Sequence, residues 1–371
     1  MDFSKPVDSS KNIIDISTDN ITTTLRVPPD IPILSDGTLF ISDGVMHMLP
    51  GIIYSPNGYT EAVVVPSMGI NQGLNFNVES KKWDIEISGM ERSISRAAIA
   101  FDAEKQVGWY YGGRTSLNLY EYGGMSRGLY RLDKGKGAPT RVETDPSSGG
   151  DVVEGELVYV KGIGKAGILV LIGGVVDEST SQAQLVSMVD RINNPILPFQ
   201  LILFFSQLSM QSVHVFDIAT EVWFVQPTTA ESQLYPPGRE QFCSVVASAE
   251  DNSSHNIYTY GGWNGSDFSA SNGVWILTLP AFHWVPVYPT TDLEANSNTL
   301  RTFGHQCQKI HEKHMVAYYG VNFNHICDNE LGKFQGMTIY DMSSLKWTTK
   351  VELENQKYLV PQVLYQIIGG G

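Results

Sequence analysis

The sequence has few basic residues and no long apolar run, and each shortage excludes a class of protein. Its 25 Lys and Arg residues are outnumbered by 39 Asp and Glu residues, which gives a formal net charge of −14. This charge repels a phosphate backbone and excludes nucleic acid as a partner. The longest apolar stretch, Ile196–Phe205, is shorter than the roughly 20 residues of a membrane helix and is interrupted by Pro198 and Gln200. No membrane span is therefore predicted in this chain.

The amino terminus also lacks the apolar core of a secretory signal, because Met1–Ser10 contains Asp2, Lys5 and Asp8. Taken alone, this indicates a cytoplasmic protein. Three Asn-x-Ser/Thr sequons favour a secreted or surface protein instead, since such sites accept glycans there. The candidate glycosylation sites are Asn20, Asn252 and Asn264.

Cysteine is scarce, and its three copies make an odd count that leaves one thiol free if the other two pair. Cys307 and Cys327 flank one apolar segment, Met315–Tyr319, and both lie near turn residues. A Cys307–Cys327 disulfide across a hairpin-like pair is one prediction. Three buried thiols that act as small hydrophobic side chains are the alternative.

Histidines crowd around the same cysteines, a composition that suggests zinc. However, His311 and His314 lack the spacing of a helical His-Glu-x-x-His site, and the charged residues between them suit an exposed hairpin turn. The other members of this cluster are His305, His325, Cys307, Cys327 and Asp328. We therefore predict neither a metal site nor a cofactor.

The sequence is built from a repeated unit. Each unit has an apolar run that ends in glycine, a variable loop, a second apolar run and, in most units, a later Trp. The paired glycines are Gly112, Gly113, Gly173, Gly174, Gly261 and Gly262, and the tryptophans are Trp83, Trp223, Trp284 and Trp347. Trp223 follows Asp217 by six residues, and Trp347 follows Asp341 by the same interval. Units of this size must stack on their neighbours to bury a continuous core.

The short apolar runs are rich in Val, Tyr and Phe and are bounded by Gly, Asn, Ser and Pro, which indicates strands. Four strands per unit in a radial arrangement make a β-propeller, so an all-β fold is predicted. One domain should cover residues 11–371, with units at about 31–88, 96–144, 152–226, 239–288 and 301–352 and half-units at 11–30 and 361–371. If strands of the terminal half-units pair, they close a ring of six blades; seven are possible if sequence is missing.

One segment, Val186–Gln207, interrupts this regular pattern with a long apolar stretch. Its first residues can be encoded by a splice-donor sequence and its last by a pyrimidine tract that ends in CAG. The glycine pairs at 112, 173 and 261 are separated by 61 and 88 residues, and removal of these 22 residues reduces the second interval to 66. We predict a retained intron; a genuine apolar insertion is the alternative.

The recurring glycine pairs and late tryptophans resemble the kelch motif over about residues 11–371. The resemblance implies that the glycines let the chain leave an inner strand and that the indole rings wedge between adjacent blades. An Arg before the first apolar run, at Arg96, Arg239 and Arg301, is also typical of the motif. The stretches Arg239–Val246 and Ile257–Gly265 resemble fungal kelch-repeat surface proteins, which usually carry a signal peptide and one transmembrane helix. Because both ends stop within a repeat, we expect those segments to be missing and the protein to lie at the cell surface.

Kelch propellers include copper radical oxidases related to galactose oxidase, whose metal needs two His and two Tyr, one of them cross-linked to Cys. Only Cys243 lies early enough in a unit for that role, and no His and Tyr set stands out around it. We therefore predict no catalytic residue. The favoured function is recognition of a protein or cell-wall carbohydrate by the loops. A copper radical oxidase and an intracellular kelch scaffold are the alternatives.

Overall fold

The computed structural model describes seven short strands and Ser80 before residue 93. From that point it describes residues 93–116, 122–126, 128–133, 139–142, 152–177, 205–264, 270–291, 300–318, 320, 337–348, 350–351 and 357–368. Within these residues, no helix is long and apolar enough to cross a membrane.

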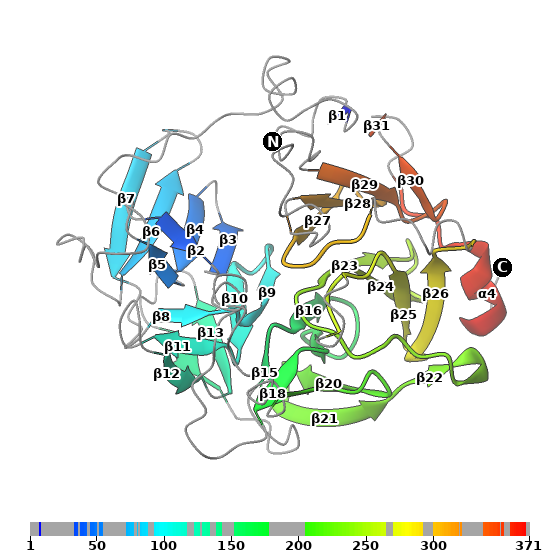
Figure 1. Ribbon diagram of the computed structural model, residues 1–371, viewed down its shortest axis with the longest axis horizontal. Coiled ribbons are helices and arrows are strands. Elements are labelled where there is room, and N and C mark those ends of the chain that lie inside the picture. The colour runs from blue at the N-terminus through cyan, green and yellow to red at the C-terminus, as the bar shows by residue number, and fades with distance from the viewer. Residues whose placement is uncertain are drawn as a thin grey trace, which may run out of the picture.

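Five sheets of four or more strands follow one another along the chain, one for each complete unit predicted from the sequence. They are arranged around a shared centre in chain order, with β3, β9, β16, β23 and β27 nearest to it (Figure 1). We number the sheets in this order. The first contains β3 (Thr38–Ser42), β4 (Val45–Leu49), β6 (Gln72–Asn77) and β7 (Lys82–Ile87). The second contains β9 (Ala98–Asp102), β10 (Val107–Tyr111), β13 (Leu129–Asp133) and β14 (Thr140–Arg141).

The remaining three sheets have the same antiparallel order from the centre outward. The third contains β16 (Glu156–Val160), β17 (Ile168–Ile172), β20 (Ser212–Asp217) and β21 (Val222–Pro227). The fourth contains β23 (Cys243–Ser248), β24 (His255–Tyr260), β25 (Val274–Leu279) and β26 (His283–Tyr288), with β22 (Thr229–Ala230) parallel to β26. The fifth contains β27 (Gln306–Ile310), β28 (His314–Tyr318), β29 (Met337–Asp341) and β30 (Lys346–Thr348).

Smaller sheets and two short helices complete the described structure. Two sheets join three short strands each: β8 (Ser93–Ser95), β11 (Arg114–Ser116) and β12 (Tyr122–Met125) in one, and β15 (Val152–Val153), β18 (Val175–Asp177) and β19 (Phe205–Gln207) in the other. Two pairs are β2 (Ile33–Ser35) with β5 (Ile52–Tyr54) and β1 (Val7–Asp8) with β31 (Lys350–Val351). The helices are the 3-10 turn η2 (Glu231–Gln233) and α4 (Gln362–Ile368).

The core lies between the sheets, as the alternation of side chains along β17 shows. Ile168, Val170 and Ile172 pack toward the fourth sheet, whereas Leu169 and Leu171 pack toward the second. Successive side chains of a strand point to opposite faces, so a strand that is apolar at every position needs a neighbour on both sides. This burial explains why single units cannot stand alone and why they form a propeller.

The carboxyl-terminal half-unit is not a strand, which corrects the prediction that both terminal strands close the ring. Residues 362–368 form α4, and its apolar residues Leu364, Ile367 and Ile368 pack against the core between the fourth and fifth sheets. Their spacing of three and four residues matches one face of a helix and not a strand. At the other end, β1 pairs with β31, so the amino-terminal segment does contact the last unit. Among the described residues, no sixth four-stranded sheet joins the two ends.

The proposed intron stays a hypothesis, because residues 178–204 lie outside the described part of the chain. The last three residues of the segment form β19, which pairs with β18 through Val175 and Gln207.

Candidate functional site

The two ends of the sheets carry different kinds of connection. In the second to fifth sheets the first two strands are joined by tight hairpins, at residues 103–106, 161–167, 249–254 and 311–313. The second and third strands are joined by longer segments, at residues 112–128, 173–211, 261–273 and 319–336. Because neighbouring strands are antiparallel, all the longer segments leave the sheets at one end. We call this the loop end and the other the hairpin end.

Four residues at the loop end link the inner strands in series. Arg96, Glu154, Gln241 and Gly304 each stand two residues before an inner strand, with φ angles of 56°, 60°, 53° and 65°. The Glu154 amide donates to the Arg96 carbonyl at 3.0 Å, the Gln241 amide to the Glu154 carbonyl at 2.9 Å, and the Gly304 amide to the Gln241 carbonyl at 2.8 Å. This axial series therefore fixes the second to fifth sheets to one another by backbone bonds.

The side chains of the axial series form a buried ionic cluster. Arg96 Nη1 bonds to Glu154 Oε1, Arg114 Nη2 lies 3.5 Å from the same oxygen, and Gln241 Nε2 donates to Glu154 Oε2 at 2.8 Å. Burial alone would raise the pKa of Glu154, but the two guanidinium groups hold that pKa well below its usual range. The cluster thus keeps a charged carboxylate at the axis.

A second carboxyl group lies two residues further along, between inner strands. Ser244 Oγ on β23 donates to Glu156 Oε2 on β16 at 2.7 Å. Burial raises the pKa of Glu156 to about 8, and the Ser244 contacts offset only part of that rise. Glu154 and Glu156 therefore have pKa values shifted in opposite directions, and Glu156 keeps its proton to a higher pH than an ordinary carboxyl group does.

The three arginines singled out by the motif do not occupy equivalent places. Arg96 is itself a residue of the axial series. Arg239 is not, and lies two residues before Gln241, the residue of the series in the fourth unit. Arg239 is buried and its Nη1 donates to the Gly261 carbonyl at 3.0 Å. Arg301 Nη1 donates to the Ala270 carbonyl at 3.2 Å. Arg239 thus holds loop backbone of its own unit, whereas Arg301 holds loop backbone of the preceding unit.

All six paired glycines lie where the second strand of a sheet turns toward the loop end, and all have positive φ. A Cβ on Gly262, where φ is 91°, would lie 2.7 Å from Phe242 Cβ and 2.9 Å from the Glu240 carbonyl oxygen. A Cβ on Gly112 would overlap the Val152 carbonyl oxygen of the next unit. Gly113, Gly174 and Gly262 donate their amides to residues of the following unit. Glycine is needed here for its backbone angle and for the close approach of neighbouring sheets.

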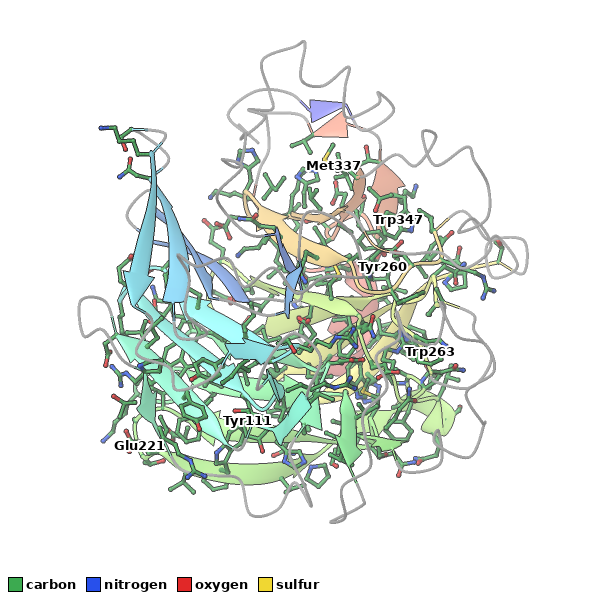
Figure 2. All side chains as sticks on the ribbon, turned by 60° about the vertical axis from the view of Figure 1, so that its left-hand side comes forward. Tyr111, Glu221, Tyr260, Trp263, Met337 and Trp347 are labelled. Atoms are coloured by element: carbon green, nitrogen blue, oxygen red, sulfur yellow. A yellow bond between two sulfur atoms is a disulfide. The ribbon has the colours of Figure 1, made fainter. Side chains whose placement is uncertain are left out.

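Three of the four predicted tryptophans lie between sheets. Trp223 of the third sheet contacts Tyr111 of the second, with ring centroids 5.3 Å apart. Trp284 of the fourth sheet is 1% exposed and donates its indole N–H to the Met210 carbonyl at 2.9 Å. Trp347 of the fifth sheet packs against Tyr260 of the fourth at 4.8 Å (Figure 2). Trp83 lies on β7 opposite Phe76. Each of these three indole rings, Trp223, Trp284 and Trp347, reaches back to the preceding sheet.

Comparison with known proteins agrees with this geometry. No family model matches the chain. A kelch repeat-containing protein of Arthroderma benhamiae is 25% identical over an alignment of 317 positions, which covers 71% of this chain and 41% of that protein. The solved structure of YjhT superposes with a TM-score of 0.52 at 13% identity, over 87% of this chain and 85% of that one. This chain is a β-propeller homologous to a kelch repeat-containing protein. It spans about two-fifths of the length of that curated relative.

In this propeller the disulfide is not the predicted one. Cys307 pairs with Cys243, whose Cα lies 5.4 Å away, and Cys327 lies outside the described residues. The prediction joined two cysteines across a segment of one unit. The observed bond joins the inner strands β23 and β27 of adjacent sheets, and only the stacking of those sheets brings the two cysteines together.

The sequons of the propeller fall at opposite ends. Asn252 is exposed in the β23–β24 hairpin, and Asn264 is exposed beside the Gly261–Gly262 pair at the loop end. Asn20 lies outside the described residues. Glycosylation of these residues stays a prediction.

The crowded histidines of the fifth unit are not gathered in one place. His314 lies at the hairpin end of β28, where its Nε2 is 4.0 Å from Asp341. His305 lies at the loop end just before β27, and burial lowers its pKa to about 3, an effect that the Tyr260 backbone offsets only in part. Cys243 and Cys307 are its neighbours, with ligand atoms within 4.8 Å of one another. Sequence distance concealed this group, because Cys243 belongs to the preceding unit.

Proposed function

We propose that this propeller is a non-catalytic recognition module that binds a protein or a cell-wall carbohydrate at its loop end. The observation that carries this proposal is the contrast between the two ends: long segments of unequal length leave one end, and tight hairpins close the other. Binding residues are concentrated on variable loops that a rigid scaffold positions. The homologous protein of Arthroderma benhamiae is a kelch repeat-containing protein, which supports an interaction module.

The axial series supplies the rigidity that such a binding end requires. Its backbone bonds join four sheets, and the buried cluster of Arg96, Arg114, Glu154 and Gln241 fixes the side chains at their meeting point. A preorganised end loses little conformational entropy on binding, so more of the contact energy contributes to affinity. The net charge of −14 further supports a partner other than nucleic acid.

We place the protein at the cell surface, as a glycoprotein that is membrane-anchored in its full-length form. The two exposed sequons support this location. A cytoplasmic scaffold is the competing location, and it would carry no glycan. Endoglycosidase treatment of the protein from its native host separates them, because only the surface protein shifts on a gel, and Asn252→Gln and Asn264→Gln assign the shift to a site.

The binding proposal is tested by deletion of side chains at each end. Asn264→Ala and Gln306→Ala remove exposed groups at the loop end, and Asn252→Ala and Lys161→Ala are matched controls at the hairpin end. The binding affinity of the purified variants is measured for immobilised chitin, β-1,3-glucan and mannan. It is also measured for the wall proteins that cross-link to the wild-type chain when that chain is incubated with wall fragments. We expect the paired loop-end variant to bind about 10-fold more weakly and the paired control to change by less than about 2-fold.

Three outcomes would overturn the proposal. The first is an equal loss of binding affinity in the loop-end and hairpin-end double variants, and the second is a loss in the hairpin-end variant alone. Either result would move the binding site away from the loop end. Copper-dependent release of peroxide from galactose or simple alcohols would replace the recognition module with the oxidase alternative.

A further inference from the structure

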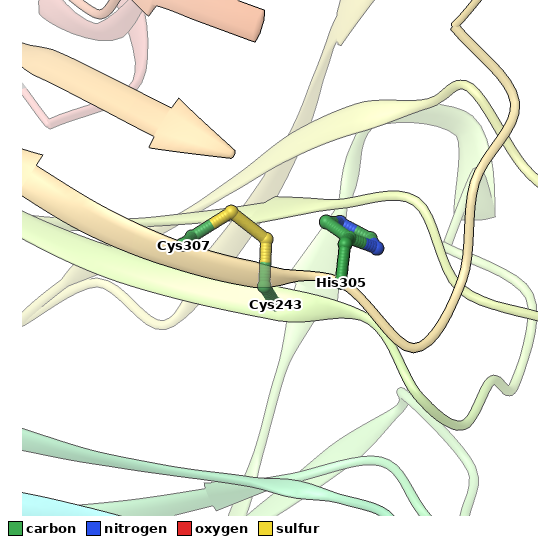
Figure 3. A group of neighbouring side chains, drawn as sticks. All are labelled: Cys243, His305 and Cys307. Atoms are coloured by element: carbon green, nitrogen blue, oxygen red, sulfur yellow. A yellow bond between two sulfur atoms is a disulfide. The ribbon is translucent and has the colours of Figure 1, made fainter. Parts of the chain in front are cut away.

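Three potential metal ligands meet at the junction of the fourth and fifth sheets. Figure 3 shows Cys243 on β23 facing Cys307 on β27, with His305 beside them. Their ligand atoms all lie within 4.8 Å of one another. Cys243 and His305 are buried and Cys307 is partly buried, so the group is largely shielded from water.

His305 is an unusual side chain for this place, because neither ring nitrogen makes a well-formed hydrogen bond among the described residues and the side chain is 2% exposed. A buried polar atom without such a bond lowers stability, so a histidine here calls for an explanation. The Tyr260 ring packs edge-on at 4.9 Å and offers no side-chain oxygen, since its hydroxyl donates to the Leu300 carbonyl. A metal ion held jointly with the two sulfurs would give an imidazole nitrogen a well-formed bond, beyond the contact that the Tyr260 backbone makes with the ring.

The local backbone is shaped around this ring. A Cβ on Gly261 would lie 2.5 Å from His305 Cε1 and 3.1 Å from Nε2. The first glycine of the pair therefore leaves room for the imidazole against the fourth sheet.

We propose that Cys243, Cys307 and His305 form a redox-gated site for a thiophilic metal ion, Zn²⁺ or Cu⁺. In the oxidised chain both sulfurs are consumed by the disulfide and no metal binds. A dithiol reductant delivers two electrons and two protons, so that the S–S bond opens to two thiols while the reductant becomes a disulfide. The metal then displaces the thiol protons and binds two thiolates and one imidazole nitrogen, a ligand set that soft cations prefer.

The two states would hold the same interface in different ways. The disulfide joins β23 to β27 covalently, and the metal would join the same two strands by coordination. Only the reduced, metal-free chain lacks a bond at this point. The site would therefore keep the fourth and fifth sheets together in either redox environment, and the interface would loosen only where both oxidant and metal are scarce.

The test compares the full chain before and after reduction with a phosphine, with thiols counted to verify that the disulfide is open. Zn²⁺ binding is measured by calorimetry, and Co²⁺ is used as a spectroscopic probe because thiolate ligands give it an intense near-ultraviolet charge-transfer band. We expect one Zn²⁺ per reduced chain, none per oxidised chain, and the cobalt band only after reduction. His305→Ala should weaken binding by at least about 100-fold, since loss of even an outer-shell partner costs about 10- to 100-fold.

Matched variants keep the result interpretable. His314→Ala removes a buried histidine from the same sheet, and Cys327→Ser removes the remaining thiol; both should leave Zn²⁺ affinity unchanged. Binding that survives in the Cys243→Ser/Cys307→Ser chain, or equal binding by oxidised and reduced chains, would overturn the proposal. If that double variant does not fold, the cobalt spectrum of the reduced wild-type chain decides, because absence of the thiolate band excludes the site.

Discussion

Cys243 and Ser244 are neighbours on β23, yet they bond to different sheets. Cys243 faces the fifth sheet and forms a disulfide with Cys307. Ser244 faces the third sheet and donates a hydrogen bond to Glu156. One inner strand thus belongs to two adjacent interfaces, one closed by a covalent bond and the other by a hydrogen bond to a carboxyl group whose pKa is raised.

Behind these polar contacts the two interfaces are built alike. Each is filled by apolar side chains from both sheets and by an indole ring from the later sheet. This ring is Trp284 between the third and fourth sheets and Trp347 between the fourth and fifth. Apolar burial is non-directional and supplies most of the stabilisation, so it can be repeated at every interface. The bond between the inner strands can therefore differ from interface to interface, and this is where sensitivity to redox state or pH enters.

The largest effect should come from removal of the indole ring that fills the interface of the third and fourth sheets. Trp284→Ala leaves a cavity in that interface and deprives the Met210 carbonyl of the indole donor, although Thr228 Oγ1 still donates to it at 2.7 Å. Truncation of a buried Trp costs about 3–5 kcal/mol. We expect a loss of this size in the free energy of unfolding, measured by denaturant titration.

Trp284→Phe is the control, because it keeps a ring and should recover most of the loss. Trp347→Ala at the neighbouring interface should cost less than Trp284→Ala, since Trp347 is only partly buried. A Trp284→Ala chain as stable as the wild type would show that the apolar filling is not what holds the two sheets together.

An intermediate effect is expected from the disulfide at the other interface. Cys243→Ala/Cys307→Ala removes a cross-link between residues 64 apart in sequence. A loop of this length corresponds to about 4 kcal/mol in the chain-entropy model, with about 2–4 kcal/mol typical in practice. We expect a loss in that range, measured by denaturant titration without added metal.

The same measurement in a reductant supplies the control. The wild-type chain should lose a comparable amount of stability, whereas the double variant should not respond. A reductant that destabilises both chains equally would place the redox sensitivity outside the Cys243–Cys307 bond.

The repeated parts of this architecture were accessible from the sequence. Paired glycines such as Gly261–Gly262 mark sharp exits from a strand, and the late tryptophans mark large side chains at a fixed place in the unit. Both signals arise within one unit, where sequence spacing determines spatial spacing. The kelch resemblance, the all-β class and five of the predicted units follow from them.

The contacts between units were not accessible in this way. The Cys243–Cys307 pairing depends on how far β23 is shifted along its length relative to β27. The Glu156–Ser244 bond depends on the corresponding shift of β16 relative to β23. No local spacing encodes these offsets. The terminal helix was missed for another reason: Val363–Ile368 is apolar enough for a strand, and its helical spacing is only two turns long.

The smallest effect, and the sharpest contrast with the redox-sensitive interface, concerns pH. The pKa of Glu156 is raised from 4.5 to about 8, so the folded chain holds a proton that the unfolded chain releases. Its stabilising contribution is complete below pH 4.5 and is lost as the pH rises through 8. We expect the Tm of the wild-type chain to fall by a few degrees between pH 7 and 9, as the Glu156 carboxyl group loses its proton. The Gln side chain of the Glu156→Gln variant stays uncharged and keeps an acceptor for Ser244, so the Tm of this variant should fall less over this interval. Parallel plots of Tm against pH for the two chains would show that the interface does not depend on the protonated carboxyl group.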